Sequence, residues 1–389
     1  MKKLKMLCAF LSVLLVILSG ILVYLVINRE TGSVNIFKNY EKSAYKEYSL
    51  NENHLKLIGR TADVNGEIVF SASGSGVSFI CEGDYAEITL APESSYVTAS
   101  HYPRIAIYSD GNLVADECIS AEKTYRINTG YSGTQITLIK LSEAMYSSVR
   151  LTKVASYGFR DIMPVGEKEL KIEFIGDSVT CGYGIDGGAY GSFSTATENF
   201  MKSYAYLTAE KLDADYSAVC YSGYGVLTGY TETGTVNDKV VMKEYDKACH
   251  LTGQEDVLWD FSGVKNELVV INLGTNDASY CGSSTYGRQR FTDAYTDMLL
   301  TVRGKNPDAY ILCILGDMNN SLYSCIEAAV ARYREQTGDT RAEAFSVEFK
   351  MGENDIVIDG HPGALSNLHA SELLAQKIQS LISFGLIER

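Results

Sequence analysis

The sequence predicts an α/β protein in which a three-layer domain built on a parallel sheet follows an all-β sandwich. Residues 51–162 contain short runs rich in β-branched and aromatic residues, and Gly, Asp, Ser and Asn separate these runs. From residue 163 to 389, apolar runs of strand length alternate with helix-like segments. Such alternation is typical of a parallel sheet covered by helices. We therefore expect a jelly-roll-like sandwich followed by an α/β/α domain.

Charge and cysteine content narrow the class of function. Acidic residues outnumber basic ones by 48 to 34, and the net charge is −14. With no long Lys/Arg stripe, we expect no nucleic-acid partner. None of the nine cysteines lies in a CxxC pair or at a zinc-ligand spacing, so no metal and no cofactor are predicted. We expect mostly buried free thiols, although a disulfide such as Cys81 with Cys118 stays open.

The N-terminus has the composition of a targeting segment. Lys2, Lys3 and Lys5 precede an uncharged apolar run from 6 to 27. As a helix this run would extend about 33 Å, which is enough to cross a bilayer. Residues 1–27 are therefore predicted to be a membrane anchor or, alternatively, a cleaved signal peptide. Either leaves the globular part outside the cytoplasm, after a polar linker over 28–50.

Strands and helices are expected at definite places. In the β region we expect strands in 67–73, 76–82, 85–91, 104–110, 134–142 and 148–156. In the second region we expect strands near 169–176, 216–222, 267–274, 309–316 and 342–349. Helices are expected near 203–212, 286–303, 322–335 and 366–384. Functional sites of parallel sheets form at the carboxyl ends of the strands, so the loops that follow these strands are the place to search.

The first such loop is Gly176-Asp177-Ser178. A serine between a strand and a helix presents its hydroxyl at the rim of the sheet. Its own amide then lies near a helix N-terminus, where donors point outward. Ser178 is therefore a candidate nucleophile, with a helix N-cap as the alternative interpretation.

Two further loops supply partners for a serine. Asn276 follows the strand near 267–274, and its amide is a candidate donor to an oxyanion. His361 lies in the loop Asp359-Gly360-His361-Pro362, and histidine is the usual general base near neutral pH. Taken singly, each loop is also compatible with an ordinary turn.

Together these motifs resemble the SGNH hydrolases, and within them carbohydrate esterase family 2. The chain reads GDSVTCGYG over 176–184, Trp-Asp-Phe over 259–261, NLGTND over 272–277 and DGHP over 359–362. This family has a small jelly roll followed by an SGNH domain, which is the order expected here. The resemblance covers about residues 52–389.

The resemblance implies a role for each residue. Ser178 would be the nucleophile and His361 its base, while Asp359 would orient His361. Ser178, Gly225 and Asn276 would form the oxyanion hole, with Gly223 as the alternative to Gly225. Asp177 is interpreted as structural.

The resemblance also implies a substrate. It predicts removal of O-acetyl groups from a polysaccharide or oligosaccharide, so the expected partner is an acetylated carbohydrate. Trp259, Tyr183 and Asp277 are candidates for contacts with it. Because the chain has one Trp and 27 Tyr, stacking on sugars would depend largely on tyrosine. The alternatives are an SGNH esterase or lipase acting on other esters, and an inactive glycan-binding surface protein.

Overall fold

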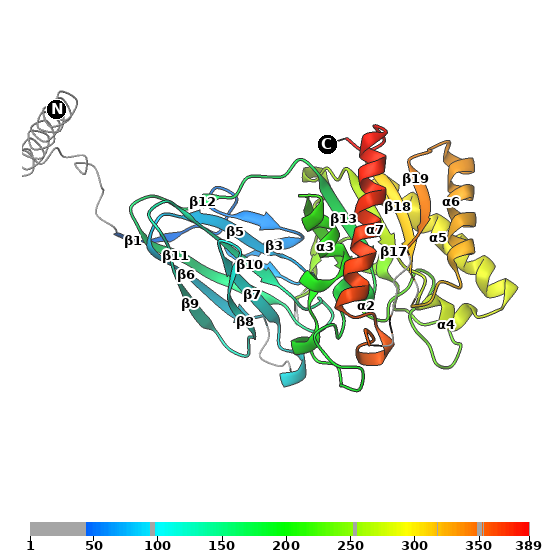
Figure 1. Cartoon of the computed structure of the whole chain (residues 1–389), viewed down its shortest axis with the longest axis horizontal. Coiled ribbons are helices and arrows are strands. Elements are labelled where there is room, and N and C mark those ends of the chain that lie inside the picture. Colours follow the sequence, from blue (N-terminus) through cyan, green and yellow to red (C-terminus); the bar gives the residue numbers. More distant parts are fainter. Residues whose placement is uncertain are drawn as a thin grey trace, which may run out of the picture. The chain divides into compact units, whose positions relative to one another are not determined.

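The computed structural model describes residues 44–388 except 94–97, 252–254, 317, 348–351 and 353. It contains a β-sandwich beside an α/β domain (Figure 1). The predicted anchor or signal segment 1–27 lies outside the described residues. Within the described part of the chain, no helix combines the length and the apolar character needed to cross a membrane.

The described residues of the sandwich form two six-stranded sheets. One has the order β3 (Thr61–Val64), β4 (Glu67–Phe70), β11 (Val149–Gly158), β6 (Gly83–Pro92) and β9 (Lys123–Asn128), and β1 (Ala44–Tyr48) pairs with β11. The other has the order β12 (Met163–Pro164), β5 (Gly76–Cys81), β10 (Thr134–Lys140), β7 (Arg104–Ser109) and β8 (Asn112–Cys118), and β2 (Lys56–Ile58) pairs with β5. Apolar side chains from both sheets form one buried core, as expected for packed sheets. The six predicted strands are present, whereas the shorter or more polar β1, β2, β3, β8, β9 and β12 escaped prediction.

Two predicted boundaries need correction. β1 lies inside the segment 28–50 that was expected to be a linker, and it pairs with β11 of the sandwich. β12 lies beyond residue 162 and pairs with β5. Both strands lie just outside the predicted range of the sandwich but pair with its sheets. Their side chains are mostly exposed, so the sequence shows no apolar pattern there.

The second domain is built on a parallel sheet in the order β14, β13, β17, β18 and β19. These strands span Asp215–Cys220, Lys171–Gly176, Leu268–Asn272, Tyr310–Leu315 and Ala342–Ser346. The register pairs Gly176 with Cys220 on one side and with Asn272 on the other. Because the three strands end level with one another, the loops that follow them meet at one edge of the sheet.

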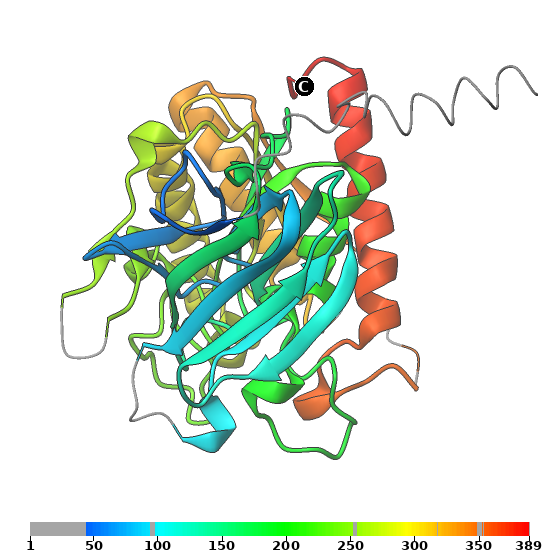
Figure 2. The same cartoon turned by 90° about the vertical axis from the view of Figure 1, so that its left-hand side faces the viewer.

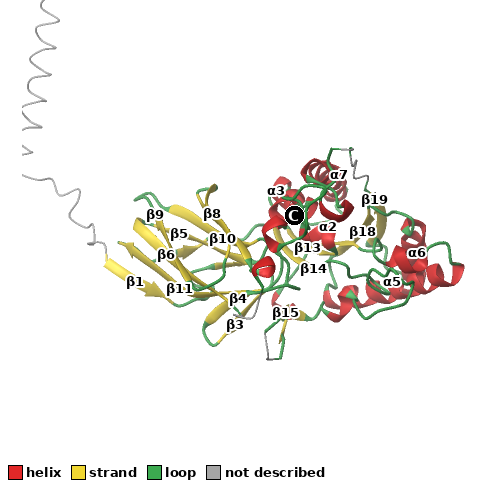
Figure 3. Cartoon of the chain, turned by 90° about the horizontal axis from the view of Figure 1, so that it is seen from below, coloured by secondary structure: helices red, strands yellow, loops and turns green. Residues whose placement is uncertain are grey.

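Helices cover both faces of this sheet, which confirms the predicted three-layer α/β/α arrangement (Figures 2 and 3). On one face, α3 (Tyr204–Lys211) packs with α7 (Ala364–Ser383). On the other face lie α5 (Thr285–Lys305) and α6 (Tyr323–Thr337). The alternation of strand residues between these two cores explains why the strands read as continuous apolar runs.

A buried ion pair joins the two domains. Arg60, between β2 and β3, contacts Glu173 of β13 at 2.7 Å, and each side chain is 1% exposed. A second pair, Lys56 with Asp215, joins β2 to β14 at 2.7 Å. The sandwich therefore rests against the parallel sheet through these two charged contacts, of which the Arg60–Glu173 pair is fully buried.

Candidate active site

Ser178 is held at the end of β13 by a tight turn. It is the first residue of the short helix α2 (Ser178–Cys181), and Asp177 caps this helix by accepting the Val179 amide at 3.1 Å. A Cβ on Gly176 would lie 2.0 Å from the Thr180 hydroxyl oxygen, so only glycine permits the turn. The alternative interpretation, in which Ser178 caps the helix, is therefore wrong: the cap is Asp177, and the Ser178 hydroxyl is left for another contact.

That contact is with His361. The Ser178 Oγ lies 2.7 Å from His361 Nε2. Both residues are buried, with exposed fractions of 6% for Ser178 and 8% for His361. His361 Nδ1 lies 3.0 Å from the backbone carbonyl of Ile358. Since a carbonyl can only accept, Nδ1 carries the proton and Nε2 is left to accept the serine hydroxyl. Burial lowers the pKa of His361, which favours this neutral, basic form.

The expected role of Asp359 needs correction. Its carboxylate accepts the hydroxyl of Tyr183 at 2.8 Å, while the Ile358 carbonyl occupies the ring nitrogen that Asp359 was expected to hold. The cause is local backbone geometry. Asp359 has φ +54°, a left-handed conformation inside the short 3₁₀ turn η6 (Ile358–Gly360). This turn aims the Ile358 carbonyl at the histidine and directs the Asp359 side chain toward Tyr183.

The predicted oxyanion-hole role of Gly225 also needs correction. The Gly225 amide donates to the Lys239 carbonyl at 3.1 Å, so it is already engaged. Gly223, the alternative, has φ +77°, is partly exposed, and would tolerate a Cβ without contact within 4 Å. Among the described residues, neither the Gly223 amide nor the Ser178 amide donates a hydrogen bond to another group. These two amides are therefore the donors left available beside the serine loop.

Asn276 follows β17 and is 7% exposed. Its Nδ2 donates to the Tyr224 carbonyl at 2.8 Å and to Asp177 Oδ2 at 3.2 Å. The side chain thus ties the serine loop to the turn that carries Gly223. Burial raises the pKa of Asp177 to about 7, consistent with a structural rather than a charged role.

Asp277 was a candidate for substrate contact, and the structure assigns it a different position. It is fully buried, and its carboxylate accepts the amides of Val226, Leu227 and Thr228 at 2.7–3.0 Å. A Cβ on Gly225 would lie 2.5 Å from this carboxylate, which explains the glycine there. Asp277 therefore holds the loop after Gly223 through its backbone amides, and because it is fully buried it cannot contact a ligand.

Tyr183, the second candidate, lies beside the base. Its ring centroid is 4.5 Å from that of His361, and on its other side it stacks on Phe193 at 4.1 Å. The row continues through Tyr146 to His101, at 5.0 and 4.6 Å. An aromatic row therefore runs from His361 of the α/β domain to Tyr146 and His101 of the sandwich. No sequence motif marked Phe193 or Tyr146.

Trp259, the third candidate, packs at the domain junction. Its ring lies 5.5 Å from the Arg60 guanidinium, within an aromatic enclosure that Tyr245 and Phe261 complete at 5.0 Å each. It also packs against Val69 of β4 in a small apolar cluster. The Trp-Asp-Phe motif therefore shields the buried ion pair of Arg60.

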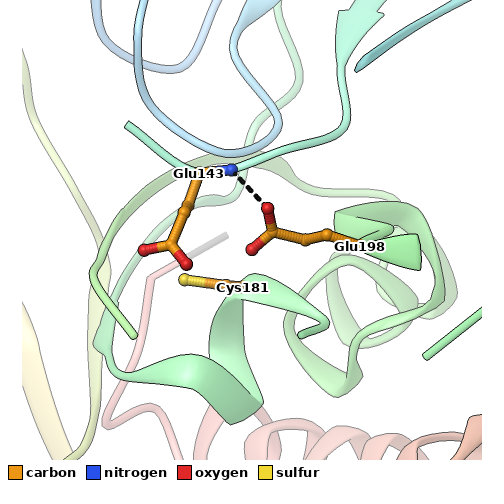
Figure 4. A group of neighbouring side chains, drawn as sticks. All are labelled: Glu143, Cys181 and Glu198. Carbon is orange, nitrogen blue, oxygen red and sulfur yellow. Dashed lines mark hydrogen bonds between the residues drawn. The ribbon is translucent and has the colours of Figure 1, made fainter. Parts of the chain in front are cut away.

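One group of side chains in the described part of the chain could in principle hold a metal ion. Glu143, Cys181 and Glu198 are buried, and one ligand atom of each lies within 4.8 Å of the others (Figure 4). The cluster already has a cation, however. The fully buried Lys140 ammonium interacts with both carboxyl groups and donates to the carbonyls of Ser71, Ser142 and Glu143. A fixed ammonium next to the carboxylates opposes a second cation, so the group fits a structural role better.

With this geometry described, comparison with known proteins identifies the family. Residues 174–370, which make up half of the chain, match the GDSL-like lipase/acylhydrolase family. The chain belongs to this family. The matched range includes Ser178, Asn276 and His361.

Individual relatives narrow the assignment. The chain is 34% identical over 223 residues to the cellulase/esterase CelE of Acetivibrio thermocellus, over 56% of this chain and 26% of that protein. It thus spans about a quarter of that relative. It is 26% identical over 315 residues to an acetylxylan esterase/glucomannan deacetylase of Cellvibrio japonicus, over 79% of this chain and 84% of that protein.

A solved structure points to the same family as these two relatives. The family two carbohydrate esterase from Clostridium thermocellum, in complex with cellohexaose, superposes with a TM-score of 0.73 at 26% identity, covering 86% of this chain and all of that chain. The resemblance to carbohydrate esterase family 2 that the motifs predicted is therefore confirmed, as is the fold class.

Proposed function

We propose that the protein is a serine esterase that removes O-acetyl groups from a polysaccharide or oligosaccharide. The observation that carries the proposal is the 2.7 Å contact between Ser178 Oγ and His361 Nε2, with Nδ1 held by the Ile358 carbonyl. This is the arrangement that a nucleophile and its general base require. The named activities of the relatives, acetylxylan esterase and glucomannan deacetylase, support the acetylated carbohydrate as substrate.

The reaction proceeds in two halves. His361 accepts the Ser178 proton while Oγ bonds to the acetyl carbon, and the same proton passes to the departing sugar oxygen when its bond to that carbon breaks. A water molecule then attacks the acetyl-serine while His361 accepts a proton from that water. His361 passes this proton to Ser178 Oγ as the bond to the acetyl carbon breaks, and acetate leaves. The Ser178 and Gly223 amides stabilise the oxyanion. Asn276 joins them by exchanging its longer bond, to Asp177, for one to the oxyanion.

We further propose that the enzyme works outside the cytoplasm, with acetylated carbohydrate at the cell surface as its substrate. Three lysines followed by the apolar run 6–27 support this location. Tethering through that run would be tested by fractionating cells that express the full chain. Recovery of the protein in the cytoplasmic fraction would contradict the proposal.

The test of the chemistry compares esters by acyl length. The wild-type protein should hydrolyse 4-nitrophenyl acetate much faster than butyrate or longer esters, and it should release acetate from acetylated xylan or glucomannan. Ser178→Ala should remain folded and lose activity by roughly 10⁴-fold or more. Faster turnover of long acyl chains would favour a lipid substrate, and absence of hydrolysis of any ester would favour a glycan-binding protein.

A further inference from the structure

A carboxylate of the sandwich reaches into the hydrolase domain beside the oxyanion loop. Glu143 follows β10 and is fully buried. Its Oε2 accepts the backbone amide of Ser222 at 2.8 Å, and Ser222 immediately precedes Gly223. This hydrogen bond joins the Glu143 carboxylate to the loop after β14, directly before the glycine whose amide is left available beside Ser178.

Glu143 is itself anchored. Its amide donates to Glu198 Oε2 at 2.9 Å, as the dashed line in Figure 4 marks, and the two carboxyl groups point toward each other there. Its carbonyl accepts the Lys140 ammonium at 3.0 Å. The side chain that holds Ser222 thus starts from a backbone that is fixed on both sides, so its position is set before a substrate arrives.

Charge balance assigns the protons in this cluster. Burial raises the pKa of Glu198 well above its usual range, and the neighbouring Glu143 carboxylate adds to the rise. Burial raises the pKa of Glu143 as well, but Ser222, the Glu198 side chain and the Lys140 charge each act to lower it. One carboxylate and one ammonium therefore balance, while Glu198 keeps its proton.

We propose that Glu143 is a positioning residue of the esterase: through the Ser222 amide it holds the Ser222-Gly223 turn so that the Gly223 amide faces the oxyanion. The sandwich thereby completes the active site of the hydrolase domain. Glu143 touches no substrate. Its effect belongs to the transition state, because a misplaced donor weakens the oxyanion contact more than it weakens binding of the neutral ester.

The experiment compares three variants of the full chain. Glu143→Met fills the space but cannot accept a hydrogen bond, whereas Glu143→Gln keeps an acceptor oxygen. Ser148→Ala is the matched control, because it removes a hydrogen bond to the hydrolase domain, to the His250 carbonyl, from the same β10–β11 connection. We measure kcat and KM on 4-nitrophenyl acetate, and hydrogen exchange of the peptide 219–226 by mass spectrometry.

We expect Glu143→Met to lower kcat by about 10- to 100-fold, approaching the loss of one oxyanion donor, with KM changed by less than about threefold. Exchange in 219–226 should accelerate. Glu143→Gln should retain most of the activity and protection, and Ser148→Ala should match the wild type. Equal losses in Glu143→Met and Ser148→Ala, or unchanged exchange in Glu143→Met, would overturn the proposal.

The kinetic part rests on the proposed esterase function, whereas the exchange measurement does not. If the wild type is as inactive as Ser178→Ala, the proposed esterase function is rejected. The exchange measurement would still decide whether Glu143 holds the Ser222-Gly223 turn. If Glu143→Met does not fold, the wild-type protein decides: an exchange rate at the Ser222 amide as fast as that of the exposed residues 188–192 would exclude the contact.

Discussion

His361, the proposed general base, is held by a backbone carbonyl and not by a carboxylate. A carbonyl fixes the ring orientation and the tautomer of His361 as well as Asp359 would, but it supplies no full negative charge to stabilise the imidazolium. Asp359 still acts on the ring at a distance, because its charge raises the pKa of His361 against the lowering by burial. Orientation and charge, which one aspartate supplies in many triads, come here from two neighbouring residues.

This division predicts how activity depends on pH. Since burial lowers the pKa of His361 below 6.5 and the base must be neutral, kcat/KM should rise with pH through a midpoint below 6.5. Asp359→Asn removes the charge that supports the imidazolium, so this midpoint should fall further, while kcat at pH 7 drops less than about tenfold. His361→Ala should lose roughly 10⁴-fold. A midpoint that rises in Asp359→Asn would contradict this interpretation, as would equal losses of activity in Asp359→Asn and His361→Ala. Tyr183→Phe is the control, because it removes the hydroxyl contact to Asp359 without changing the charge.

At the scale of secondary structure, two buried acidic residues, Asp277 and Glu143, hold the loop after β14 by accepting its backbone amides. Asp277 accepts three consecutive amides over 226–228. Together with Glu143 at Ser222, it brackets the Gly223 turn from two sides. A loop with several glycines would otherwise sample many conformations, so the carboxylates supply order that its own sequence lacks.

We therefore expect Asp277→Asn to destabilise the fold although it contacts no ligand. The asparagine keeps one acceptor but turns an NH₂ group toward a backbone amide, and an unsatisfied buried pair of this kind costs about 1–3 kcal/mol. Urea unfolding should show the loss, and kcat should fall with it. Asp260→Asn is the control, because Asp260 caps the exposed turn η5 (Phe261–Gly263) and should leave unfolding unchanged. Equal stability of the two variants would disprove this role of Asp277.

At this scale the limits of sequence reasoning become clear. Ser178, Asn276 and His361 could be located because the carboxyl ends of parallel strands converge, so motifs after separate strands must meet. The choice between Gly223 and Gly225 could not be made, because it depends on which amide Lys239 occupies. Glu143 left no signal, since its partner, Ser222, lies 79 residues away in another domain.

For the whole molecule, the two domains are predicted to form one cooperative unit. Arg60 and Glu173 are each 1% exposed, and Glu173 also accepts the Tyr245 hydroxyl at 2.7 Å. A buried pair of this kind adds little over an apolar contact, but the loss of one partner leaves a buried charge uncompensated. The sandwich is therefore required to compensate the buried charge of Glu173 on β13, in addition to supplying Glu143.

Arg60→Ala should accordingly destabilise both domains by roughly 3–5 kcal/mol, in a single unfolding transition. The one tryptophan, Trp259, packs against Arg60 and reports this junction, so its emission should shift to longer wavelength in the variant and stay unchanged when cello-oligosaccharide is added to the wild type. Arg150→Ala is the control. It breaks a partly exposed pair with Glu67, at 2.8 Å, and should cost less than about 1 kcal/mol. Two separate transitions in the wild type, or a tryptophan signal that follows the sugar, would show that the domains are independent or that Trp259 belongs to the substrate site.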